Sequence, residues 1–563
     1  MMMQTSAPEF TQPPLLAVRD LIVTVDAPEG ARVLLDRVSI DVARGEVLGL
    51  VGESGSGKSL LCRTLVGLMP SRAIRLTGGS ILLDGQEIAG ADETALQAIR
   101  GARIGMIFQN PTSHLDSVMR IGDQIVEGIV YHQQLSRDAA KSLALDIMGQ
   151  VGFTDPPRQF SSYAHEFSGG MRQRAMIAIA LACNPEILIA DEPTTALDVT
   201  IQAQILHLLL DLRVKRSLSI ILVTHDLGVV AQTCDRIAVM RHGRIVETGE
   251  KRQILKAPQA DYTKTLISSH PSMPVEQELA TAAPVERPAD VRPLIEIDDL
   301  AVRFPTGGGL FSKRKHFSAV DGVSLQIWPG ETVGIVGESG SGKSTLARAM
   351  LGLTPASAGH VSFHGASLRL HRTEALLALR SEAAMVFQDP YNSLNPRMTI
   401  GETLSEVLSV QKKIPAARIP ERVSELLDLV ELERSFATRK PRTMSGGQCQ
   451  RAGIARALAI DPRVIVADEC IAALDVTIQA QIVALFRKLV ATMDLTLVFI
   501  AHDLPVVRSL CQRVIVMHHG RIVEEGRSED VFANPREAYT AGLIEAIPDI
   551  DPDRPLSQRS NHK

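Results

Sequence analysis

Short apolar runs alternate along the chain with longer stretches in which apolar residues recur every three or four positions. The short runs, which are rich in β-branched residues, predict β-strands at residues 47–51, 103–108, 187–190 and 218–224. The longer stretches predict helices at residues 168–183 and 201–213. Strands that alternate with helices in this way predict an α/β fold with a mainly parallel sheet between layers of helices.

The second half of the chain repeats the first. Residues 16–21 (LAVRDL) correspond to residues 295–300 (IEIDDL), and later landmarks recur 277 to 285 residues apart. The chain, at 563 residues, is also too long for one hydrophobic core. We therefore expect two tandem domains at residues 14–270 and 294–547, a Pro-, Ala- and Glu-rich linker at 271–293, and a disordered tail at 548–563.

Composition narrows the classes of function. The net charge of −5 gives no broad basic field, which argues against nucleic acid as a partner. Residues 1–14 lack the basic and apolar regions of a signal peptide, and no run approaches the roughly 18 apolar residues that span a bilayer. Any role at a membrane is therefore expected to run through partner proteins. The six scattered cysteines argue against a zinc or iron–sulfur site and for a reducing compartment.

One eight-residue stretch, GESGSGKS, occurs at residues 52–59 and again at residues 337–344. Both copies fit the phosphate-binding pattern G-x-x-x-x-G-K-[ST], in which glycines let backbone N–H groups reach phosphate oxygens. Each copy lies between an apolar run and a helical pattern, whose N-terminus favours an anion. We expect Lys58 and Lys343 to contact the β- and γ-phosphates, and Ser59 and Ser344 to bind Mg²⁺. The loop alone leaves kinases, GTPases, recombinases and transporter ATPases open.

Two adjacent carboxylates end an apolar run in each half: Asp191 and Glu192 in the first, Asp468 and Glu469 in the second. A buried strand brings both acids to the carboxyl edge of the sheet, where the phosphate-binding loop also lies. The first acid of each pair is suited to the Mg²⁺ shell, and the second is suited to polarising an attacking water.

Two further polar residues recur in both halves. His225 and His502 each lie 33 positions after the second acid, at the end of an apolar run. We expect them to orient the water and the γ-phosphoryl group rather than to act as the principal base. Gln109 and Gln388 each follow an apolar run that ends in Phe, and an amide there could ligate Mg²⁺.

The stretch that decides between these classes is FSGGMRQR at residues 167–174, with MSGGQCQR at residues 444–451. A Ser-Gly-Gly before a long helix makes an anion-binding helix N-terminus. With the loop, the glutamine, the paired acids, an Ala-Leu-Asp triplet and the histidine, all present twice, it resembles the ATP-binding-cassette (ABC) ATPases over essentially the whole chain. The resemblance implies two tandem P-loop ABC ATPase domains, each with a mainly parallel core sheet, an antiparallel β subdomain and a helical signature subdomain.

In that family two domains pair head to tail, so that each ATP lies between the loop of one domain and the Ser-Gly-Gly signature of the other. Carried over here, the resemblance implies Mg²⁺ and ATP as cofactors. The catalytic residues that it implies are Glu192, His225, Glu469 and His502. It implies as Mg²⁺ ligands Ser59, Gln109, Asp191, Ser344, Gln388 and Asp468. It implies as ATP-binding residues Gly52, Ser54, Gly55, Gly57, Lys58, Ser59, Leu60, Gln109, Ser168, Gly169, Gly170, Asp191, Phe304, Gly337, Ser339, Gly340, Gly342, Lys343, Ser344, Thr345, Gln388, Ser445, Gly446, Gly447 and Asp468.

The closer resemblance is to the ATPases of dipeptide, oligopeptide, nickel and glutathione importers, some of which are fused double cassettes. It rests on FQDP at 387–390 with SLNP at 393–396, on LDVTIQAQ at 197–204, and on closing patterns at 257–263 and 534–540. It implies an ATP-hydrolysing subunit that energises import of a peptide-like solute, peripheral to the cytoplasmic face of the inner membrane. Its implied partners are two transmembrane permease subunits and an extracytoplasmic solute-binding protein.

The chain departs from the family pattern at several positions. The adenine-stacking aromatic of the family corresponds to Phe304 in the second half but to Val25 in the first, so the first nucleotide is expected to bind less tightly. Cys470 and Cys449 replace a usual Pro and Arg, and SHLDS at 113–117 replaces Ser-Leu-Asn-Pro. None of these changes removes a phosphate contact, so both sites are expected to hydrolyse ATP. Neither half ends in the cysteine cluster of many relatives, so no iron–sulfur or zinc site is expected.

Other classes fit less well. The alternative is a soluble double-cassette ATPase that acts on ribosomes, but such factors carry a long charged segment between their domains. A DNA-repair cassette ATPase would carry zinc cysteines or a long coiled coil, and an exporter would normally be fused to membrane spans. The sequence does not identify the transported solute, because a cassette contacts ATP and the permeases and never the solute.

Overall fold

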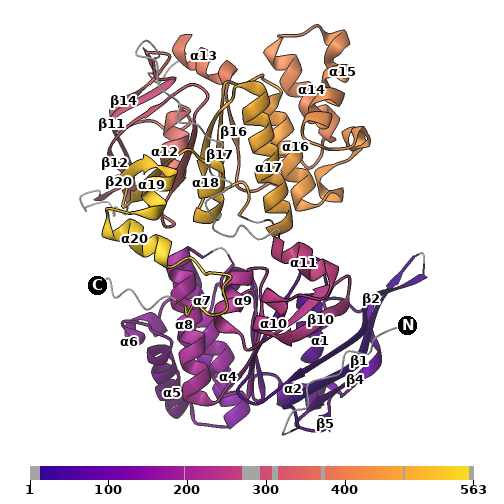
Figure 1. The fold of residues 1–563 in the computed structure, drawn as a ribbon. Helices are drawn as coiled ribbons and strands as arrows, with labels where there is room; N and C mark the ends of the chain where they lie inside the picture. Colours follow the sequence, from indigo (N-terminus) through magenta and orange to yellow (C-terminus); the bar gives the residue numbers. More distant parts are fainter. Residues whose placement is uncertain are drawn as a thin grey trace. The chain divides into compact units, whose positions relative to one another are not determined.

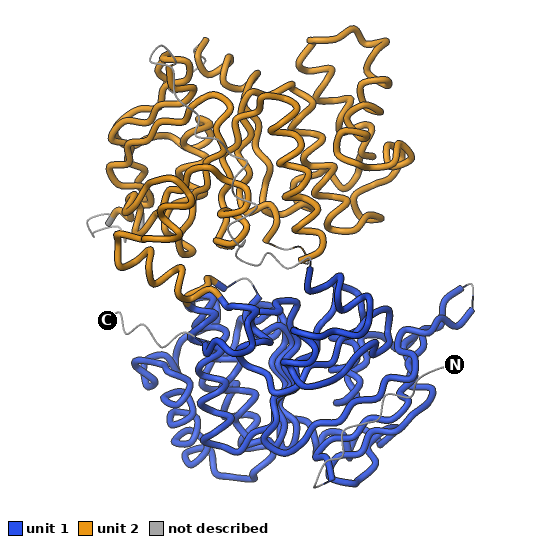
Figure 2. Tube along the Cα trace, viewed as in Figure 1, with its two compact units in different colours: residues 1–197, 201–270, 548–563 blue, residues 198–200, 271–547 orange. Residues whose placement is uncertain are grey.

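The computed structural model describes residues 13–556 except Glu29, Ala196, residues 269–291, 307–314 and 369–373, Ala473 and Asp475. Contacts within the chain divide it into two compact units (Figure 2). Unit 1 comprises residues 1–197, 201–270 and 548–563, and unit 2 comprises residues 198–200 and 271–547. Most of the expected linker, residues 271–291, lies outside the described residues, so the domain boundaries stay a prediction.

A six-stranded sheet forms the centre of unit 1 (Figure 1). Its strands are β3 (Val47–Val51), β6 (Ile104–Ile107), β7 (Ile187–Asp191), β8 (Ser219–Val223), β9 (Arg236–Arg241) and β10 (Arg244–Glu250). Their order is β10-β9-β3-β8-β7-β6, and every neighbouring pair is parallel except β9 and β10. The loop, the acids and the histidine follow β3, β7 and β8, so the parallel arrangement brings them to one edge of the sheet.

Successive residues of the central strands enter two different cores. Val47 and Val51 of β3 belong to one core with the helices, whereas Leu48 and Leu50 belong to the other. The neighbouring strands β7 and β8 alternate in the same way. Because both faces of the sheet are covered, each strand reads as an unbroken apolar run rather than as an alternation.

A second, antiparallel sheet packs on one face of the central sheet of unit 1. Its strands are β1 (Leu16–Ala27), β2 (Gly30–Val42), β4 (Ile74–Leu83) and β5 (Gln86–Glu87), in the order β2-β1-β4-β5. Leu21 and Val23 of β1 are fully buried in the core that the two sheets share with the first helix. This is the antiparallel β subdomain that the resemblance implies.

The remaining elements of unit 1 are helices, most of which pack on the opposite face of the central sheet. They are α1 (Lys58–Leu65), α2 (Glu93–Ile99), α3 (Pro111–His114), α4 (Ile121–Gln133), α5 (Arg137–Gln150), α6 (Pro156–Phe160), a 3₁₀ turn (Ala164–Glu166), α7 (Gly169–Leu181), α8 (Val199–Arg216), α9 (Leu227–Thr233), α10 (Lys251–Lys256) and α11 (Asp261–Ser268). Helices α4, α5 and α7 contact one another and form the helical part that carries the Ser-Gly-Gly signature.

Unit 2 repeats this plan with the same order of strands, although among its described residues no α-helix corresponds to α3 or α6. Its central sheet contains β13 (Thr332–Val336), β16 (Ala383–Val386), β17 (Val464–Asp468), β18 (Thr496–Ile500), β19 (Arg513–His518) and β20 (Arg521–Arg527), in the order β16-β17-β18-β13-β19-β20. Its antiparallel sheet contains β11 (Ile295–Thr306), β12 (Lys315–Ile327), β14 (Ala358–Phe363) and β15 (Ala366–Ser367), in the order β12-β11-β14-β15.

The helices of unit 2 also follow those of unit 1. They are α12 (Lys343–Met350), α13 (Glu374–Glu382), α14 (Ile400–Gln411), α15 (Ile419–Leu429), α16 (Gly446–Leu458), α17 (Val476–Met493), α18 (Leu504–Leu510), α19 (Ser528–Ala533) and α20 (Ala538–Glu545), with 3₁₀ turns at Ala416–Arg418, Arg434–Thr438 and Pro441–Thr443. The expected fold class is confirmed in both units, and each strand or helix end predicted for unit 1 lies within three residues of the observed one.

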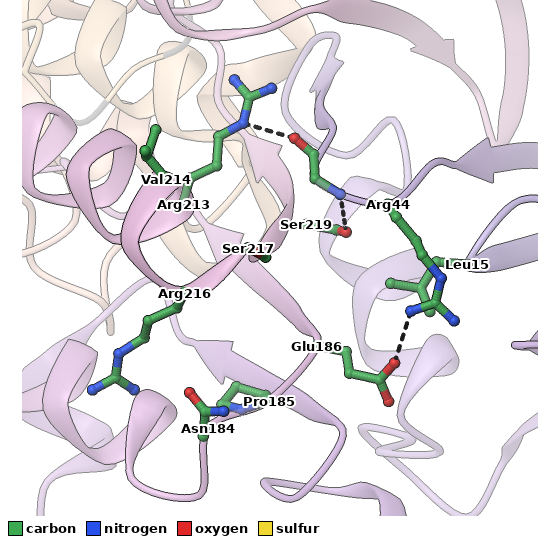
Figure 3. Close-up of a pocket in the computed structure, with 11 residues that line it drawn as sticks. Leu15, Arg44, Asn184, Pro185, Glu186, Arg213, Val214, Arg216, Ser217 and Ser219 are labelled. Carbon is green, nitrogen blue, oxygen red and sulfur yellow. Dashed lines mark hydrogen bonds and ion pairs between the residues drawn. The ribbon is translucent and has the colours of Figure 1, made fainter.

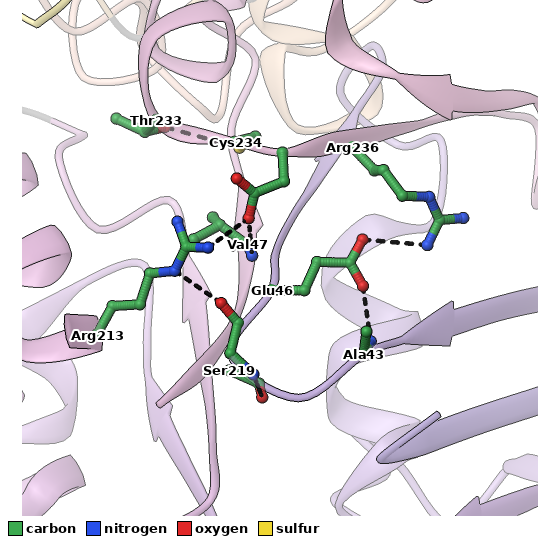
Figure 4. A network of polar contacts seen from close by, with 10 residues as sticks. Ala43, Glu46, Val47, Arg213, Ser219, Thr233, Cys234 and Arg236 are labelled. Carbon is green, nitrogen blue, oxygen red and sulfur yellow. Dashed lines mark hydrogen bonds and ion pairs between the residues drawn. The ribbon is translucent and has the colours of Figure 1, made fainter. Parts of the chain in front are cut away.

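A network of hydrogen bonds and ion pairs fixes the start of β3 (Figure 4). The Asp235 carboxylate accepts hydrogen bonds from the Val47 N–H at 2.9 Å and from Arg213 at 2.7 Å. Arg213 also donates to the Gly45 carbonyl, and Arg236 pairs with the buried Glu46 at 3.1 Å. These bonds satisfy the polar groups where the chain enters the sheet, so that β3 delivers the phosphate-binding loop in a fixed register.

The described end of the chain, residues 548–556, groups with unit 1. Its Asp553 pairs with Arg252 at 2.6 Å and also with Lys256 of α10, and Leu556 joins the unit 1 core. Residues 557–563, the rest of the expected tail, lie outside the described residues.

One helix in the described part of the chain, α17, is long and apolar enough to cross a membrane by length and composition alone. Leu485, Phe486 and Leu489 on this helix are almost fully buried in the core of unit 2. Helix α8 occupies the same place in unit 1 and begins with the same residues, Val-Thr-Ile-Gln-Ala-Gln. One face of α17 therefore packs in the core of unit 2, as one face of α8 packs in the core of unit 1.

Candidate functional site

The phosphate-binding loop of unit 1, residues 52–59, joins the end of β3 to the start of α1. Gly52 adopts φ 151°, and a Cβ atom at this position would lie 2.1 Å from the Met240 carbonyl oxygen of β9. The same approach recurs in unit 2, where a Cβ on Gly337 would lie 2.2 Å from the Met517 carbonyl oxygen. Glycine is therefore required because the loop backbone passes directly against the neighbouring strand.

The lysine of each loop is buried and bonded to the backbone of its own loop. Lys58, 5% exposed, donates to the carbonyl oxygens of Gly52 at 2.7 Å and Glu53 at 2.8 Å. Lys343, 4% exposed, donates to the carbonyl oxygens of Gly337 and Glu338 at 2.8 and 2.9 Å. Burial lowers the pKa of Lys343. Both ammonium groups therefore lie inside the loop that each sequence copy predicts as a phosphate cradle.

The predicted Mg²⁺ ligands meet at the carboxyl edge of the sheet. Ser59 donates to an Asp191 carboxylate oxygen at 3.0 Å, and Ser344 donates to Asp468 at 2.7 Å. Desolvation raises the pKa of both carboxylates, while the serine hydroxyls oppose that shift. Hydroxyl and carboxylate oxygens are the ligands that Mg²⁺ takes, so this pair of donors fits the ion. Among the described residues, no group of three or more His, Cys, Asp or Glu side chains could hold a metal.

Glu192 lies one residue beyond β7 and adopts an unusual backbone conformation, with φ 49°. Its carboxylate accepts hydrogen bonds from Gln109 and Thr195, both at 2.8 Å, and lies 3.5 Å from the His225 ring. Burial alone would raise the pKa of Glu192, but the bond to His225 and its charge bring that pKa down to about 2. Burial opposes protonation of His225, yet Glu192 raises the pKa of the imidazole. The carboxylate is therefore ionised and held in place from three directions.

Glu469 of unit 2 has the same backbone conformation, with φ 45°, but a different set of neighbours. Gln388 donates to it at 2.8 Å, matching Gln109, and Lys343 lies 3.9 Å away. Ala472 stands where unit 1 has Thr195, so one hydrogen bond is lost. Within the described residues, His502 and Glu469 form no ion pair that corresponds to the one between His225 and Glu192. The sequence motifs are repeated, but the support of the second acid is not.

The Ser-Gly-Gly signatures lie at helix N-termini, as expected. Ser168 caps α7, and its hydroxyl accepts a hydrogen bond from the Met171 N–H at 3.4 Å. Ser445 caps α16 and accepts from the Gln448 N–H at 3.3 Å, while Gln448 reaches back to the Ser445 N–H. Within each unit, the signature lies in the helical part and the phosphate-binding loop lies at the central sheet. The predicted joining of signature and loop across the two halves stays a prediction.

Two aromatic residues stand on the antiparallel sheet of unit 2 where a base could stack. Phe304 is 43% exposed and faces Phe317, 52% exposed, across the β11–β12 pair. In unit 1 the corresponding cross-strand pair is Val25 and Arg32. The sequence prediction included Phe304 and missed Phe317, whose only signal is the alternation of β12 opposite Phe304.

One tyrosine near the end of each unit was also missed. The hydroxyl of Tyr262 accepts a hydrogen bond from the Glu53 N–H at 3.1 Å, and Tyr539 accepts one from the Glu338 N–H at 3.1 Å. The available signal was the Tyr-Thr pair that recurs in the closing patterns of both halves. Local spacing could not connect it to a loop 209 residues earlier.

A pocket of about 640 Å³ lies at the opposite, amino-terminal edge of the unit 1 sheet (Figure 3). Arg44, Arg213 and Arg216 line it, but Arg44 pairs with Glu186 and Arg213 bonds to Gly45. None of the predicted site residues lines this pocket. Arg213 also pairs with Asp235, and Arg216 bonds to the Leu181 carbonyl and to Gln150, so the pocket gives no reason to move the candidate site away from the loop.

Comparisons with known proteins agree with this geometry. Residues 35–195 and 320–472 match the family described as ABC transporter. Residues 246–295 and 523–563 match the family described as oligopeptide/dipeptide transporter, C-terminal region. Each match occurs twice, once in each half, as the duplication requires.

Full-length relatives are similar over almost the whole chain. The peptidoglycan transport ATP-binding protein YejF of Agrobacterium fabrum is 44% identical over 96% of this chain and 98% of its own length. The glutathione import ATP-binding protein GsiA of Escherichia coli K12 is 41% identical over 97% of this chain and 91% of its own length. Among solved structures, a post-hydrolysis dimer of the cassette MJ0796 with ADP and Pi is 31% identical and covers 42% of this chain and 98% of its own, with a TM-score of 0.38.

Proposed function

The chain belongs to the ABC transporter family, and from that premise we propose that it is the ATP-hydrolysing subunit of an importer for peptide-like solutes. One observation carries the proposal. In both units the loop serine bonds to the acid at the sheet edge, and both halves also contain a segment that matches the oligopeptide/dipeptide transporter C-terminal region. The peptide-like class of cargo is favoured by that region and by the names of the full-length relatives.

The residues around each loop account for hydrolysis. In unit 1, Lys58 and the loop N–H groups would bind the phosphates, and Ser59, Asp191 and Gln109 would hold Mg²⁺. The ion, when bound, neutralises charge on the transferred phosphoryl group. Glu192 accepts a proton from the attacking water, and its low pKa keeps it ionised for that purpose. His225 holds the Glu192 carboxylate in position.

Unit 2 supplies the same groups: Lys343, Ser344, Asp468, Gln388 and Glu469. We further propose that each ATP is completed by the signature of the other unit, Ser445 and Gly447 for the first site, Ser168 and Gly170 for the second. A single chain then provides two sites with no need for a second ATPase subunit. The remaining partners are two membrane permeases and an extracytoplasmic solute-binding protein, which place the chain at the cytoplasmic face of the inner membrane.

Reconstitution tests this function. The full chain is expected to co-purify with two hydrophobic permeases and to drive ATP-dependent uptake of a labelled dipeptide or glutathione into proteoliposomes that hold the permeases and the binding protein. The matched control is the chain with Glu192→Gln and Glu469→Gln, which should assemble with the permeases and support no uptake. Co-sedimentation of the chain with ribosomes, with no permease bound, would contradict the proposal and favour a translation factor.

A further inference from the structure

The closing helix of each unit reaches the phosphate-binding loop through one tyrosine. In unit 1 the Glu53 N–H donates to the hydroxyl of Tyr262 on α11 at 3.1 Å. In unit 2 the Glu338 N–H donates to the hydroxyl of Tyr539 on α20 at 3.1 Å. The chain has five tyrosines, and these two make the same contact in separate units. Repetition at equal distance argues against an accidental approach.

The ring of each tyrosine is held by the last residue of the strand beside the loop. The Arg241 guanidinium, at the end of β9, lies 4.6 Å from the centre of the Tyr262 ring. At the same position of β19, the His518 ring stacks on Tyr539 at 3.9 Å with an interplanar angle of 24°. The ring partners differ in chemistry while the hydroxyl contact is kept. The contact to the loop is therefore the shared feature of the two arrangements.

The start of each closing helix is anchored as well. The Glu247 carboxylate of β10 accepts hydrogen bonds from the Gln259 and Ala260 N–H groups at 2.8 and 3.1 Å. The Glu524 carboxylate of β20 accepts from the Arg536 and Glu537 N–H groups at 2.9 and 3.2 Å. Because strand, helix start and ring are all fixed, the hydroxyl meets the loop from a rigid support.

The tyrosine contacts the loop residue that the phosphate-binding lysine also contacts. The Glu53 carbonyl accepts from Lys58 at 2.8 Å, while its N–H donates to Tyr262. At the other end of the loop, the Ser56 carbonyl accepts from the Gly243 N–H of the β9–β10 turn at 2.8 Å. Unit 2 repeats this second point, with 3.0 Å between the Gly520 N–H and the Ser341 carbonyl. The backbone of the loop is thus held at both ends before any phosphate arrives.

We propose that Tyr262 and Tyr539 are positioning residues that orient the phosphate-binding loops for ATP, and that this is a task of the C-terminal region of each unit. Both tyrosines lie inside the segments that match the oligopeptide and dipeptide transporter C-terminal region. N–H groups that are already oriented bind an anion without a further loss of conformational entropy in the loop. The hydroxyl contact therefore strengthens nucleotide binding. The inference rests on the proposed function, since it requires the loop to bind ATP.

Burial raises the pKa of Tyr539 to about 12, so the phenol keeps its proton at neutral pH. The oxygen of a neutral phenol accepts the loop N–H, and replacement of the residue by phenylalanine removes the hydroxyl while it keeps the ring. Packing of the ring against Arg241 or His518 survives that replacement. A role in packing and a role in positioning therefore predict different results for Tyr→Phe.

The experiment isolates one site at a time in the full chain. Tyr262→Phe is placed in a Lys343→Ala background, and Tyr539→Phe in a Lys58→Ala background, and Mg-ATP binding is measured by calorimetry. Loss of one hydrogen bond predicts a Kd about three- to tenfold higher, a matching rise in KM, and kcat within about twofold. Hydrogen exchange should become faster in the peptide that contains Glu53, while Tm changes little.

Two controls sharpen the result. Tyr131→Phe removes a hydroxyl that bonds to Gln97 at 3.1 Å on the exposed surface of α4, and it should alter neither Kd nor exchange. Tyr262→Leu removes ring and hydroxyl together and should add a fall in Tm. An unchanged Kd and unchanged exchange in Tyr262→Phe, with normal ATP binding in the parent chain, would overturn the inference. If the parent chain binds no ATP, the proposed function fails first, and the inference fails with it.

Discussion

Glu192 and Glu469 occupy equivalent positions with unequal support. The Glu192 carboxylate accepts hydrogen bonds from Gln109 and Thr195 and pairs with His225. The Glu469 carboxylate accepts one hydrogen bond, from Gln388, and lies near Lys343. Both keep the carboxylate that we propose accepts a proton from water, and both have the left-handed backbone conformation. The two sites are therefore both equipped to hydrolyse ATP, and we expect them to differ in rate rather than in kind.

Substitution of each acid by its amide tests this expectation. Glu192→Gln and Glu469→Gln should each lower ATP turnover per chain, and the double variant should lower it by about 10² or more, because an amide accepts no proton. Exposed Glu127→Gln on α4 is the matched control and should retain full turnover. A single substitution that leaves both hydrolysis and transport intact would show that the site concerned is not competent.

The two units also differ in the residues expected to stack on the adenine base. Phe304 and Phe317 present aromatic surface in unit 2, where unit 1 has Val25 and Arg32. Stacking of a base on an aromatic ring contributes about 1–3 kcal/mol. Phe304→Val should therefore weaken ATP binding at the second site about five- to 150-fold, and Val25→Phe should tighten it at the first. Calorimetric titration checks both. Equal affinities in Phe304→Val and the parent chain would remove Phe304 from the site.

At the scale of the element, the loop depends on a close passage against the neighbouring strand. Gly52→Ala places a Cβ 2.1 Å from a backbone oxygen that cannot move without shifting β9. Overpacking of this kind costs about 1–3 kcal/mol, and displacement of the loop should also abolish ATP binding at the first site. Gly128→Ala on α4, with nothing within 4 Å, should instead be neutral or stabilising by up to about 1 kcal/mol.

Denaturant unfolding followed by circular dichroism measures both glycine variants. An alanine at position 52 that leaves the unfolding midpoint and ATP binding unchanged would show that the loop does not need the contact with β9. If Gly128→Ala lowered the free energy of unfolding as much as Gly52→Ala, the loss in Gly52→Ala could not be assigned to the contact with β9.

Element order and site chemistry could be predicted from the sequence because their signals are local. The loop motif, the acids after an apolar run and the helix after Ser-Gly-Gly each lie within about a dozen residues. Helix and strand ends were less certain, since Val199 and Thr200 begin α8 ahead of the predicted residue 201. Capping and side-chain contacts, rather than apolar periodicity, decide where an element ends.

Contacts between distant residues could not be predicted in this way. Tyr262 bonds to Glu53 only because β9 pairs with β3 and α11 follows the β9–β10 hairpin. Phe317 joins Phe304 only through the register of β11 and β12. Thr195 and Ala472 occupy one motif position, and the consequence appears only when the carboxylate and its partners are placed together.

At the scale of the whole molecule, one chain carries the proposed phosphate- and Mg²⁺-binding groups twice. Each unit has its own loop, a Ser–Asp pair proposed to hold Mg²⁺ and a glutamate proposed to accept a proton, and each ends in a region that matches the oligopeptide and dipeptide transporter type. Fusion fixes the ratio of the two cassettes at one to one. A transporter built with this chain therefore needs a single copy of it for two ATP sites.

The stoichiometry of Mg-ATP binding tests this claim most directly. The chain with Glu192→Gln and Glu469→Gln, which should bind without hydrolysis, is titrated with Mg-ATP by equilibrium dialysis. The account predicts two ATP molecules per chain, falling to one when Lys58→Ala or Lys343→Ala is added and to none when both are added. One ATP per chain that is lost with either lysine substitution, or binding that survives both, would contradict it.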